Sequence, residues 1–202
     1  MRIIIVASSK YKNFDNYTYN EGDFLIGIED GTYEIIKKGL NVDLSIGDFD
    51  TTSHYDCIVE NVSNIIKYPK EKDEIDLELA LKYVNEKFKN QPIYIFNATS
   101  GRLDHELVTI KLLIKYCDLE IHLMNSFEEV IYINNNYVLN DSFKRFSLIP
   151  FEKVELEVIG SKYELEKSTL SITDCFTSSN ETKDIPTYIN IYSGGVILVK
   201  EV

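Results

Sequence analysis

The chain has 202 residues, of which 44% are hydrophobic and 27% are charged, and this composition excludes disorder as a description of the whole chain. The formal net charge is -12 and the isoelectric point is near 4.7, so broad attraction to nucleic acid or to an anionic membrane is not expected. Cys57, Cys117 and Cys175 lack the spacing of a zinc site or a disulfide framework, and the first apolar run is too short for a signal peptide or a membrane span, so we expect a cytoplasmic protein.

Residues 1–125 alternate between strand and helix patterns. Short apolar runs predict strands at residues 3–7, 24–28, 44–46, 93–96 and 120–124. A further strand is expected at either Ile58-Val59 or Ile65-Ile66. Residues 32–38 predict a short helix, and helical spacing recurs in two longer stretches: Leu77, Ala80, Leu81, Val84 and Phe88, and then Leu103, Leu107, Ile110 and Ile114. This alternation predicts an α/β domain with an open, mostly parallel sheet and helices on both faces.

Residues 126–202 have no helical period. Short strand candidates follow one another at 130–133, 137–139, 146–149, 154–158, 163–165, 170–172, 188–192 and 196–199. Turn residues separate them, as in Asn134-Asn135-Asn136 and Gly194-Gly195. We therefore expect an all-β, antiparallel sandwich domain, although a barrel fits the same pattern.

The first acidic cluster is Asp48 and Asp50, which follow the apolar strand at 44–46. If that strand is buried, both carboxylates emerge together at its end, and two such acids repel each other unless a cation lies between them. The alternative is an ordinary turn, because Gly47 and Asp are common turn residues.

The second acidic cluster, at the start of the 77–88 helix, contains Asp73 and Asp76, which would be neighbours on one helical face. Asp73 as an N-cap, with acids in the first turn, explains the acidic residues equally well. It does not explain Lys70 and Lys72 beside them, a mixture expected where phosphate and metal are bound together.

The third cluster is Thr99-Ser100-Gly101-Arg102-Leu103-Asp104-His105, between a predicted strand and a helix. Small residues and a helix N-terminus suit a phosphate, and Arg102 can bind phosphate oxygens with two donors. Asp104 and His105 could serve a metal or a proton transfer. Alternatively, Thr99 or Ser100 only caps the helix, and His105 is an ordinary histidine.

The three clusters follow predicted strands or begin the next helices, which is where open parallel sheets bind ligands. Neither a P-loop nor a dinucleotide-binding glycine motif occurs, and there is no Gly-x-Ser-x-Gly or Cys-His arrangement for covalent catalysis.

Taken together, these motifs resemble thiamine pyrophosphokinase, which transfers the pyrophosphoryl group of ATP to the hydroxyl of thiamine and releases AMP. The resemblance runs through Gly47-Asp48-Phe49-Asp50-Thr51, then Tyr68-Pro69 with Lys72, Asp73, Asp76 and Glu78, then Ala98 to His105, and ends on Ser179-Asn180-Glu181.

The resemblance implies roles for these residues. Asp48, Asp50 and Asp76 would hold Mg2+, with Asp73 and Asp104 close enough to take part in catalysis. Lys72, Thr99, Ser100, Gly101, Arg102 and His105 would bind ATP. Asp30, Ser178, Ser179 and Asn180 would bind thiamine. Family members are dimers that share sites between subunits, so a homodimer is expected here, with residues 1–125 as the ATP and Mg2+ domain and residues 126–202 as the thiamine-binding and dimerisation domain.

Some residues depart from the family pattern. Ser100-Gly101 stands where two small residues, often Gly-Gly, precede the arginine, and Glu29-Asp30-Gly31-Thr32 is a reduced form of an Ala-Asp-Gly-Gly-Ala stretch. The chain has no Trp, so an aromatic lid over thiamine would be Tyr or Phe, with Phe176 a candidate. Two alternatives stay open: a pyrophosphokinase acting on another alcohol, such as a hydroxymethyl pterin, and a noncatalytic thiamine-binding protein.

Overall fold

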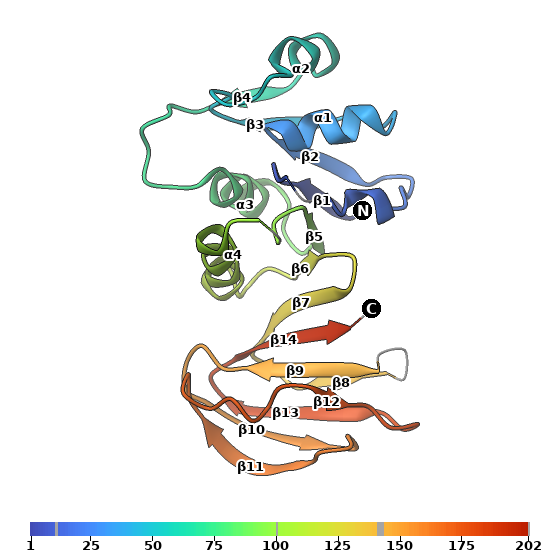
Figure 1. The fold of residues 1–202 in the computed structure, drawn as a ribbon, viewed down its shortest axis with the longest axis vertical. Helices are drawn as coiled ribbons and strands as arrows, with labels where there is room; N and C mark the ends of the chain where they lie inside the picture. Colours follow the sequence, from blue (N-terminus) through green and yellow to red (C-terminus); the bar gives the residue numbers. More distant parts are fainter. Residues whose placement is uncertain (11, 100, 141–143, 202) are drawn as a thin grey trace. The chain divides into compact units, whose positions relative to one another are not determined.

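The computed structural model describes residues 1–10, 12–99, 101–140 and 144–201. The chain divides into two compact units, Met1–Asn125 and Ser126–Val202 (Figure 1). We call them unit 1 and unit 2 and describe each by itself. No helix among the described residues is both long enough and apolar enough to cross a membrane.

Unit 1 is built on a parallel sheet. Its strands are β1 (Ile3–Val6), β2 (Phe24–Ile28), β3 (Leu44–Gly47), β4 (Ile65–Lys67), β5 (Ile93–Phe96) and β6 (Ile121–Met124), in the order β6-β5-β1-β2-β3-β4. Every strand pair in this order is parallel. The chain runs outward from β1 to β4 and then returns to β5 on the other side of β1, so the strand order reverses between β1 and β5. Ligands of such sheets bind outside the carboxyl ends of the strands at this point.

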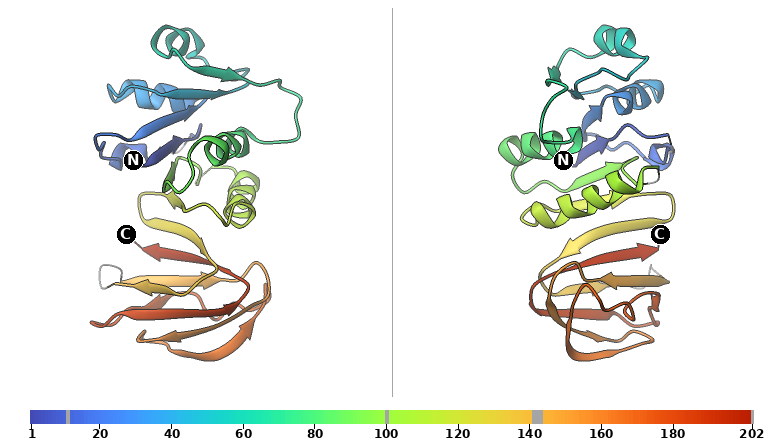
Figure 2. Two further views of the ribbon diagram at one scale, coloured as in Figure 1. Left: turned by 180° about the vertical axis from the view of Figure 1, so that it is seen from behind. Right: turned by 60° about the vertical axis from the view of Figure 1, so that its left-hand side comes forward.

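Helices cover both faces of the unit 1 sheet. α1 (Asp30–Lys37) and α2 (Tyr55–Asn61) lie on one face, and α3 (Asp76–Lys87) and α4 (Leu103–Lys115) lie on the other (Figure 1 and Figure 2). A short 3-10 helix, η1 (Phe14–Asn16), follows β1. All the residues of β1 are fully buried, which explains why the sequence of the strand is continuously apolar. The predicted open, parallel α/β architecture is confirmed.

Two predictions for unit 1 differ from the structure. Ile58-Val59 belongs to α2, so of the two strand alternatives only the one at Ile65-Ile66 is correct. In α4, the residues buried against the rest of the unit are Thr109, Leu112 and Leu113, whereas Leu103 and Leu107 are 69% and 46% exposed. The predicted apolar face of α4 is therefore wrong, because apolar residues occur on two sides of this helix and only one side meets the sheet.

Unit 2 consists of antiparallel strands in two sheets. The strands are β7 (Glu128–Ile133), β8 (Tyr137–Leu139), β9 (Arg145–Ile149), β10 (Val154–Ile159), β11 (Leu165–Leu170), β12 (Asn180–Glu181), β13 (Thr187–Ser193) and β14 (Val196–Glu201). One sheet has the order β12-β9-β14-β7 and the other β11-β10-β13-β8. Alternate residues of both sheets, including Ile131, Leu148, Leu156 and Ile189, form a single buried cluster between them. The predicted antiparallel all-β part is confirmed, and the arrangement is a sandwich.

Two strand predictions in unit 2 merge into one strand. The runs at 163–165 and 170–172 were expected to be separate, but β11 occupies the polar segment between them, Leu165–Leu170. This strand lies at the end of its sheet, where polar side chains are tolerated. β12 is too short and polar to give a strand pattern in the sequence.

Candidate active site

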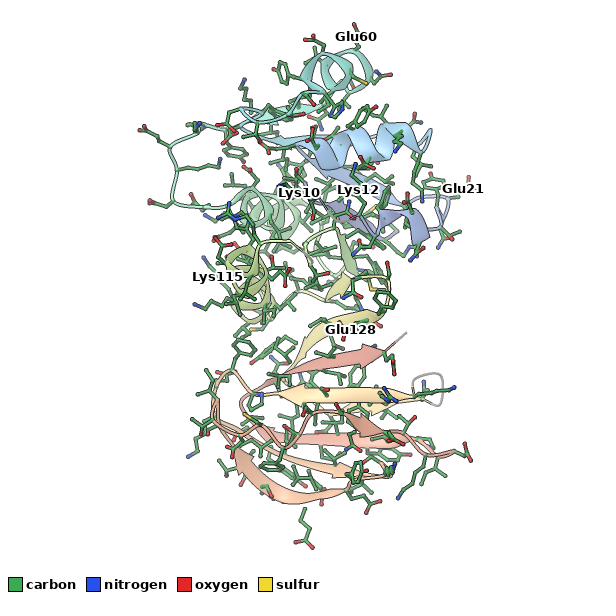
Figure 3. All side chains as sticks on the ribbon, viewed as in Figure 1. Lys10, Lys12, Glu21, Glu60, Lys115 and Glu128 are labelled. Atoms are coloured by element: carbon green, nitrogen blue, oxygen red, sulfur yellow. The ribbon has the colours of Figure 1, made fainter. Side chains whose placement is uncertain are left out.

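A cavity of about 830 Å³ lies in unit 1 where the loops after β1, β2 and β5 meet the first turns of α3 and α4. Lys10, labelled in Figure 3, comes from the segment after β1 and lines this cavity. The polar and charged lining residues are Ser8, Ser9, Lys10, Glu29, Asp30, Thr51, Lys72, Asp76, Asn97, Arg102, His105, Glu106 and Thr109. The cavity therefore lies at the carboxyl ends of the strands, at the reversal of the strand order.

Beside the cavity, Glu29, Asp48 and Asp50 form an acidic cluster in which one carboxylate oxygen from each residue lies within 4.8 Å of the others. β3 ends at Gly47, and the loop that follows carries Asp48 and Asp50. A Cβ atom at Gly47 would lie 2.6 Å from Glu29 Cγ, so glycine allows the Glu29 side chain to cross the end of β3. Glu29 Oε1 accepts a hydrogen bond of 3.0 Å from the backbone N–H of Phe49.

Two lysines neutralise part of this acidic charge. Lys72 Nζ lies 3.3 Å from Asp48 Oδ2 and 3.1 Å from Asp76 Oδ1, and Lys70 pairs with Asp50. The side chain of Lys72 is 13% exposed, whereas that of Lys70 is 76% exposed. Lys72 is therefore a fixed part of the site that joins the loop after β3 to the start of α3.

Burial and close contact shift the pKa values of Glu29 and Asp48 in opposite directions. Burial raises the pKa of Glu29 to about 7, and the hydrogen bond to Asp48 and the charge of Asp76 act in the same direction. Burial also opposes ionisation of Asp48, but hydrogen bonds from Asp50, Glu29 and Lys72 outweigh it and lower the pKa of Asp48 to about 2. A divalent cation in the cluster would favour the charged form of both groups.

The loop between β5 and α4 supplies the opposite wall. Arg102 donates to both carboxylate oxygens of Asp104, at 3.1 and 2.5 Å, and both side chains are mostly exposed. The backbone N–H of Gly101 donates to Glu106 Oε1 at 2.9 Å. Thr99 Oγ1 is buried without a hydrogen-bond partner among the described residues. Arg102 and the first turn of α4 thus present donors suited to an anion at this end of the cavity.

Comparison with known families assigns both units. The model of the thiamin pyrophosphokinase catalytic domain matches residues 16–124, and that of the thiamin pyrophosphokinase vitamin B1 binding domain matches residues 130–195. The chain belongs to the thiamine pyrophosphokinase family.

Individual thiamine pyrophosphokinases are similar along the whole chain. The enzyme of Bacillus subtilis (strain 168) is 32% identical over 196 residues, which covers 90% of each sequence. A crystal structure of the Bacillus subtilis protein superposes with a TM-score of 0.84 at 27% identity, covering 100% of this chain and 99% of that one. The Geobacillus thermodenitrificans protein has a TM-score of 0.85 at 25% identity, covering 100% and 98%.

Several residues predicted to form a thiamine pyrophosphokinase site lie together in unit 1. The predicted residues that line the cavity are Asp30, Lys72, Asp76, Gly101, Arg102 and His105. Asp48 and Asp50 lie next to the cavity, because they cluster with Glu29 and because Asp48 pairs with Lys72. Asp104 is not among the lining residues, but it accepts two hydrogen bonds from Arg102, which lines the cavity. Asp73 is exposed in the loop before α3, which begins at Asp76 with Ile75 as its N-cap, so Asp73 neither caps that helix nor shares its face. Ser100 lies outside the described residues.

The carboxylates of unit 1 fit a Mg2+ ion. Asp76 Oδ1 is buried, and no donor among the described residues is aligned to hydrogen-bond it, although Lys72 Nζ lies 3.1 Å away. Carboxylate oxygens are the ligands that Mg2+ prefers, and the Glu29, Asp48 and Asp50 cluster provides three more groups. These carboxylate oxygens thus form a set of ligands that suits a hard divalent cation.

The predicted thiamine segment of unit 2 lines a small cavity of about 100 Å³ with Tyr163, Phe176 and Ser178. Asn180 Nδ2 donates to Tyr163 O at 2.8 Å, and Asn180 Oδ1 accepts from Tyr163 N–H at 3.1 Å. Ser179 donates its backbone N–H to Ser147 Oγ at 2.9 Å. Asn180 and Ser179 therefore shape this segment, whereas the exposed ring of Phe176 is available for contact.

Sequence reasoning missed Glu29 and Glu106. Glu29 follows β2, which is the neighbour of β3 in the sheet, so its carboxylate reaches Asp48 and Asp50. No spacing in the sequence signals this contact, because it depends on β2 and β3 being neighbours in the sheet. Glu106 gave no signal, because an acid in the first turn of a helix is common without any ligand.

Proposed function

We propose that the cavity of unit 1 binds ATP with Mg2+ and that the chain transfers the pyrophosphoryl group of ATP to the hydroxyl of thiamine, giving thiamine diphosphate and AMP. The observation that carries this proposal is the cluster of Glu29, Asp48 and Asp50 beside a cavity that also contains Lys72 and Arg102. Carboxylates that can bind a cation and basic side chains that can bind phosphate therefore lie at the same edge of the sheet, as phosphoryl transfer requires.

In this proposal, Asp48, Asp50, Asp76 and Glu29 hold Mg2+, which supplies charge neutralisation on the phosphate oxygens. Arg102 exchanges its contact with Asp104 for the phosphates, since a guanidinium binds phosphate with two parallel donors. Lys72 keeps the loop after β3 and the start of α3 together while phosphate charge enters the site. Gly101 and His105 complete the phosphate wall, and Thr99, whose hydroxyl is buried, belongs to the same loop behind it.

The chemical step is an in-line displacement. The hydroxyl oxygen of thiamine forms a bond to the β-phosphorus of ATP, and the bond between that phosphorus and the oxygen bridging to the α-phosphate breaks, so AMP leaves with the electron pair. The hydroxyl proton passes to a carboxylate, for which Asp73 and Asp104 are the candidates because neither lies in the acidic cluster. Catalysis of this kind is mainly positioning and electrostatic stabilisation.

We further propose that unit 2 contributes the thiamine contacts, as the vitamin B1 binding description of residues 130–195 suggests. Ser178 and Phe176 line its small cavity, and Ser179 and Asn180 hold the segment in place. A homodimer that shares sites between subunits, and a cytoplasmic location, complete the proposal. The three cysteines are free, which is consistent with a reducing compartment.

The test is AMP formation from ATP and Mg2+ in the presence of thiamine, with a hydroxymethyl pterin as the competing alcohol. We expect AMP and thiamine diphosphate in equal amounts, and no product with the pterin. Asp50→Asn should abolish product formation and leave the circular dichroism spectrum unchanged. Full activity in this variant would contradict the metal assignment, and AMP formation with the pterin alone would assign a different acceptor.

A further inference from the structure

The loop that carries Asp48 and Asp50 has no regular structure of its own. We call residues 48–54, between β3 and α2, the metal loop. The backbone N–H of Asp50 donates to Asp48 Oδ1 at 3.1 Å, a contact within the loop. The partner of the Asp50 carboxylate is the highly exposed Lys70, whose long side chain does not fix a position. What orders the metal loop must therefore come from neighbouring elements.

The turn between β2 and α1 provides these contacts. Glu29 accepts from Phe49 N–H at 3.0 Å and from Thr51 Oγ1 at 3.5 Å, so it contacts the first half of the metal loop. The next residue, Asp30, contacts the second half. Its Oδ1 accepts from Thr52 Oγ1 and from His54 Nδ1, the latter at 3.1 Å.

His54 is held from two further directions. Its ring stacks on Tyr33 of α1, with ring centroids 3.8 Å apart and an angle of 7° between the planes. Its backbone N–H donates to Thr52 Oγ1 at 3.1 Å, and it occupies the N-cap position of α2. Asp30, Thr52 and His54 therefore form a closed set of contacts that ties the end of the metal loop to the first two turns of α1.

We propose that Asp30 and His54 are positioning residues that fix the metal loop and thereby set the affinity of the Asp48 and Asp50 carboxylates for a divalent cation. This inference rests on the proposed function in that it assumes a cation at these carboxylates. Groups that orient metal ligands contribute to metal affinity because the ordering of the ligands is then completed before the ion binds. The sequence prediction gave Asp30 a direct contact with substrate; here it acts through the loop.

Because the Asp30 and His54 side chains are partly exposed, a role in positioning the metal loop can be distinguished from a role in stabilising the fold. The side chains of His54 and Asp30 are 37% and 40% exposed, and ion pairs at such positions add little to the free energy of unfolding. Removing the contact should therefore weaken cation binding while hardly changing the melting temperature.

Two substitutions at His54 separate its contacts. His54→Asn keeps a donor nitrogen at the same number of bonds from Cα as Nδ1 but loses the ring that stacks on Tyr33. His54→Phe keeps the ring and loses the donor. If the hydrogen bond to Asp30 orders the metal loop, the Asn variant resembles the unaltered chain and the Phe variant does not.

The measurement is Mn2+ binding to the full chain without nucleotide, followed by the electron paramagnetic resonance signal of free Mn2+, with melting temperatures recorded alongside. We expect His54→Phe to weaken Mn2+ binding by about 10-fold, and Asp30→Ala to weaken it at least as much, because the alanine removes the oxygen that accepts from both Thr52 and His54. The double variant should bind no more weakly than Asp30→Ala alone, since the His54 contact is already lost there. His54→Asn should stay within about twofold of the unaltered chain.

Unchanged Mn2+ affinity in His54→Phe would overturn the inference, as would an equal loss in His54→Asn, which would assign the effect to ring stacking. Failure of the unaltered chain to bind Mn2+ would overturn it too. The proposed reaction can fail separately: a chain that binds Mn2+ in this pattern but forms no AMP with thiamine would contradict the acceptor and leave the positioning role in place.

Discussion

Lys72 Nζ lies 3.3 Å from Asp48 Oδ2, although 24 residues separate them in the sequence. The same ammonium lies 3.1 Å from Asp76 Oδ1, so one cation joins the acidic cluster after β3 to the acidic start of α3. The two sequence motifs are therefore one electrostatic unit. Lys72 is largely shielded from solvent, so its ammonium compensates the charge of both carboxylates when no metal ion is bound, and its loss leaves both carboxylates uncompensated.

Lys72→Met should lower the melting temperature in the absence of divalent cations, because Asp48 and Asp76 then repel each other without compensation. Millimolar Mg2+ should restore most of this loss, since the ion binds the same carboxylates. Catalysis should fall by about 100-fold, the typical effect of removing one charged group from a phosphoryl-transfer site. Differential scanning calorimetry with and without Mg2+ measures the first effect.

Lys82→Met is the matched control for Lys72. Lys82 lies on α3, the helix that follows Lys72, and pairs with Glu74 in a partly exposed ion pair outside the cavity. Its variant should show neither the cation-dependent melting nor the loss of activity. A Lys72 variant that melts identically with and without Mg2+ would show that the carboxylates are not cation ligands.

The parallel sheet could be predicted from the sequence because its strands are buried on both faces and so read as continuous apolar runs. β1, for example, is Ile-Ile-Ile-Val with no exposed residue. α2 could not be predicted, because Tyr55–Asn61 is short and only Ile58 is buried, so no helical period develops. The exposed side of α4 was misassigned for the opposite reason, an excess of apolar residues on two faces.

The candidate site was predictable where acids follow strands directly, as at Asp48 and Asp50. It was not predictable where a contact depends on strand order. Glu29 reaches Asp48 only because β2 and β3 are neighbours, and His54 reaches Asp30 only because the metal loop folds back over α1. Single-residue spacing carries no information about such contacts between elements.

Arg102→Lys should raise the KM for ATP by about 10-fold with little change in the KM for thiamine, because a lysine replaces two parallel donors with one point charge. The free energy of unfolding should stay nearly constant, since Arg102 and Asp104 form a mostly exposed pair. Steady-state kinetics with each substrate varied in turn gives both constants. Equal changes in both KM values would indicate that Arg102 shapes the cavity and does not contact phosphate.

Acid should destabilise unit 1 through Asp23. Burial opposes ionisation of Asp23, but hydrogen bonds from Arg2, Tyr17 and Asn20 outweigh it and lower its pKa to about 2. A carboxyl whose pKa is lower in the folded chain stabilises the fold at pH values above its unfolded pKa, near 4, and this contribution is lost as the pH falls toward 2. The loss should be about 2 kcal/mol for a shift of this size.

Urea denaturation between pH 5 and pH 2 measures this contribution. Asp23→Asn should reduce the acid-induced loss in this window by about 2 kcal/mol, because the amide does not titrate, and Asp48, whose pKa is also lowered to about 2, should account for part of the remainder. Asp118→Asn is the control, since Asp118 is exposed and its substitution should leave the curve unchanged. An Asp23 variant with the full acid-induced loss would place the titrating group elsewhere.

Gly47→Ala should damage the acidic cluster more than the fold. The new Cβ would lie 2.6 Å from Glu29 Cγ, so the Glu29 side chain must move and with it the contact to Phe49 N–H. We expect activity to fall by at least about 10-fold and stability by about 1 to 3 kcal/mol, the usual cost of overpacking.

Gly39→Ala is the control, because Gly39 has a φ of +71° but no atom within 4 Å of the added Cβ. It should lose about 1 kcal/mol of stability through backbone strain and keep full activity. If both variants lose stability but Gly47→Ala retains the activity of the unaltered chain, then the position of Glu29 is not critical for catalysis.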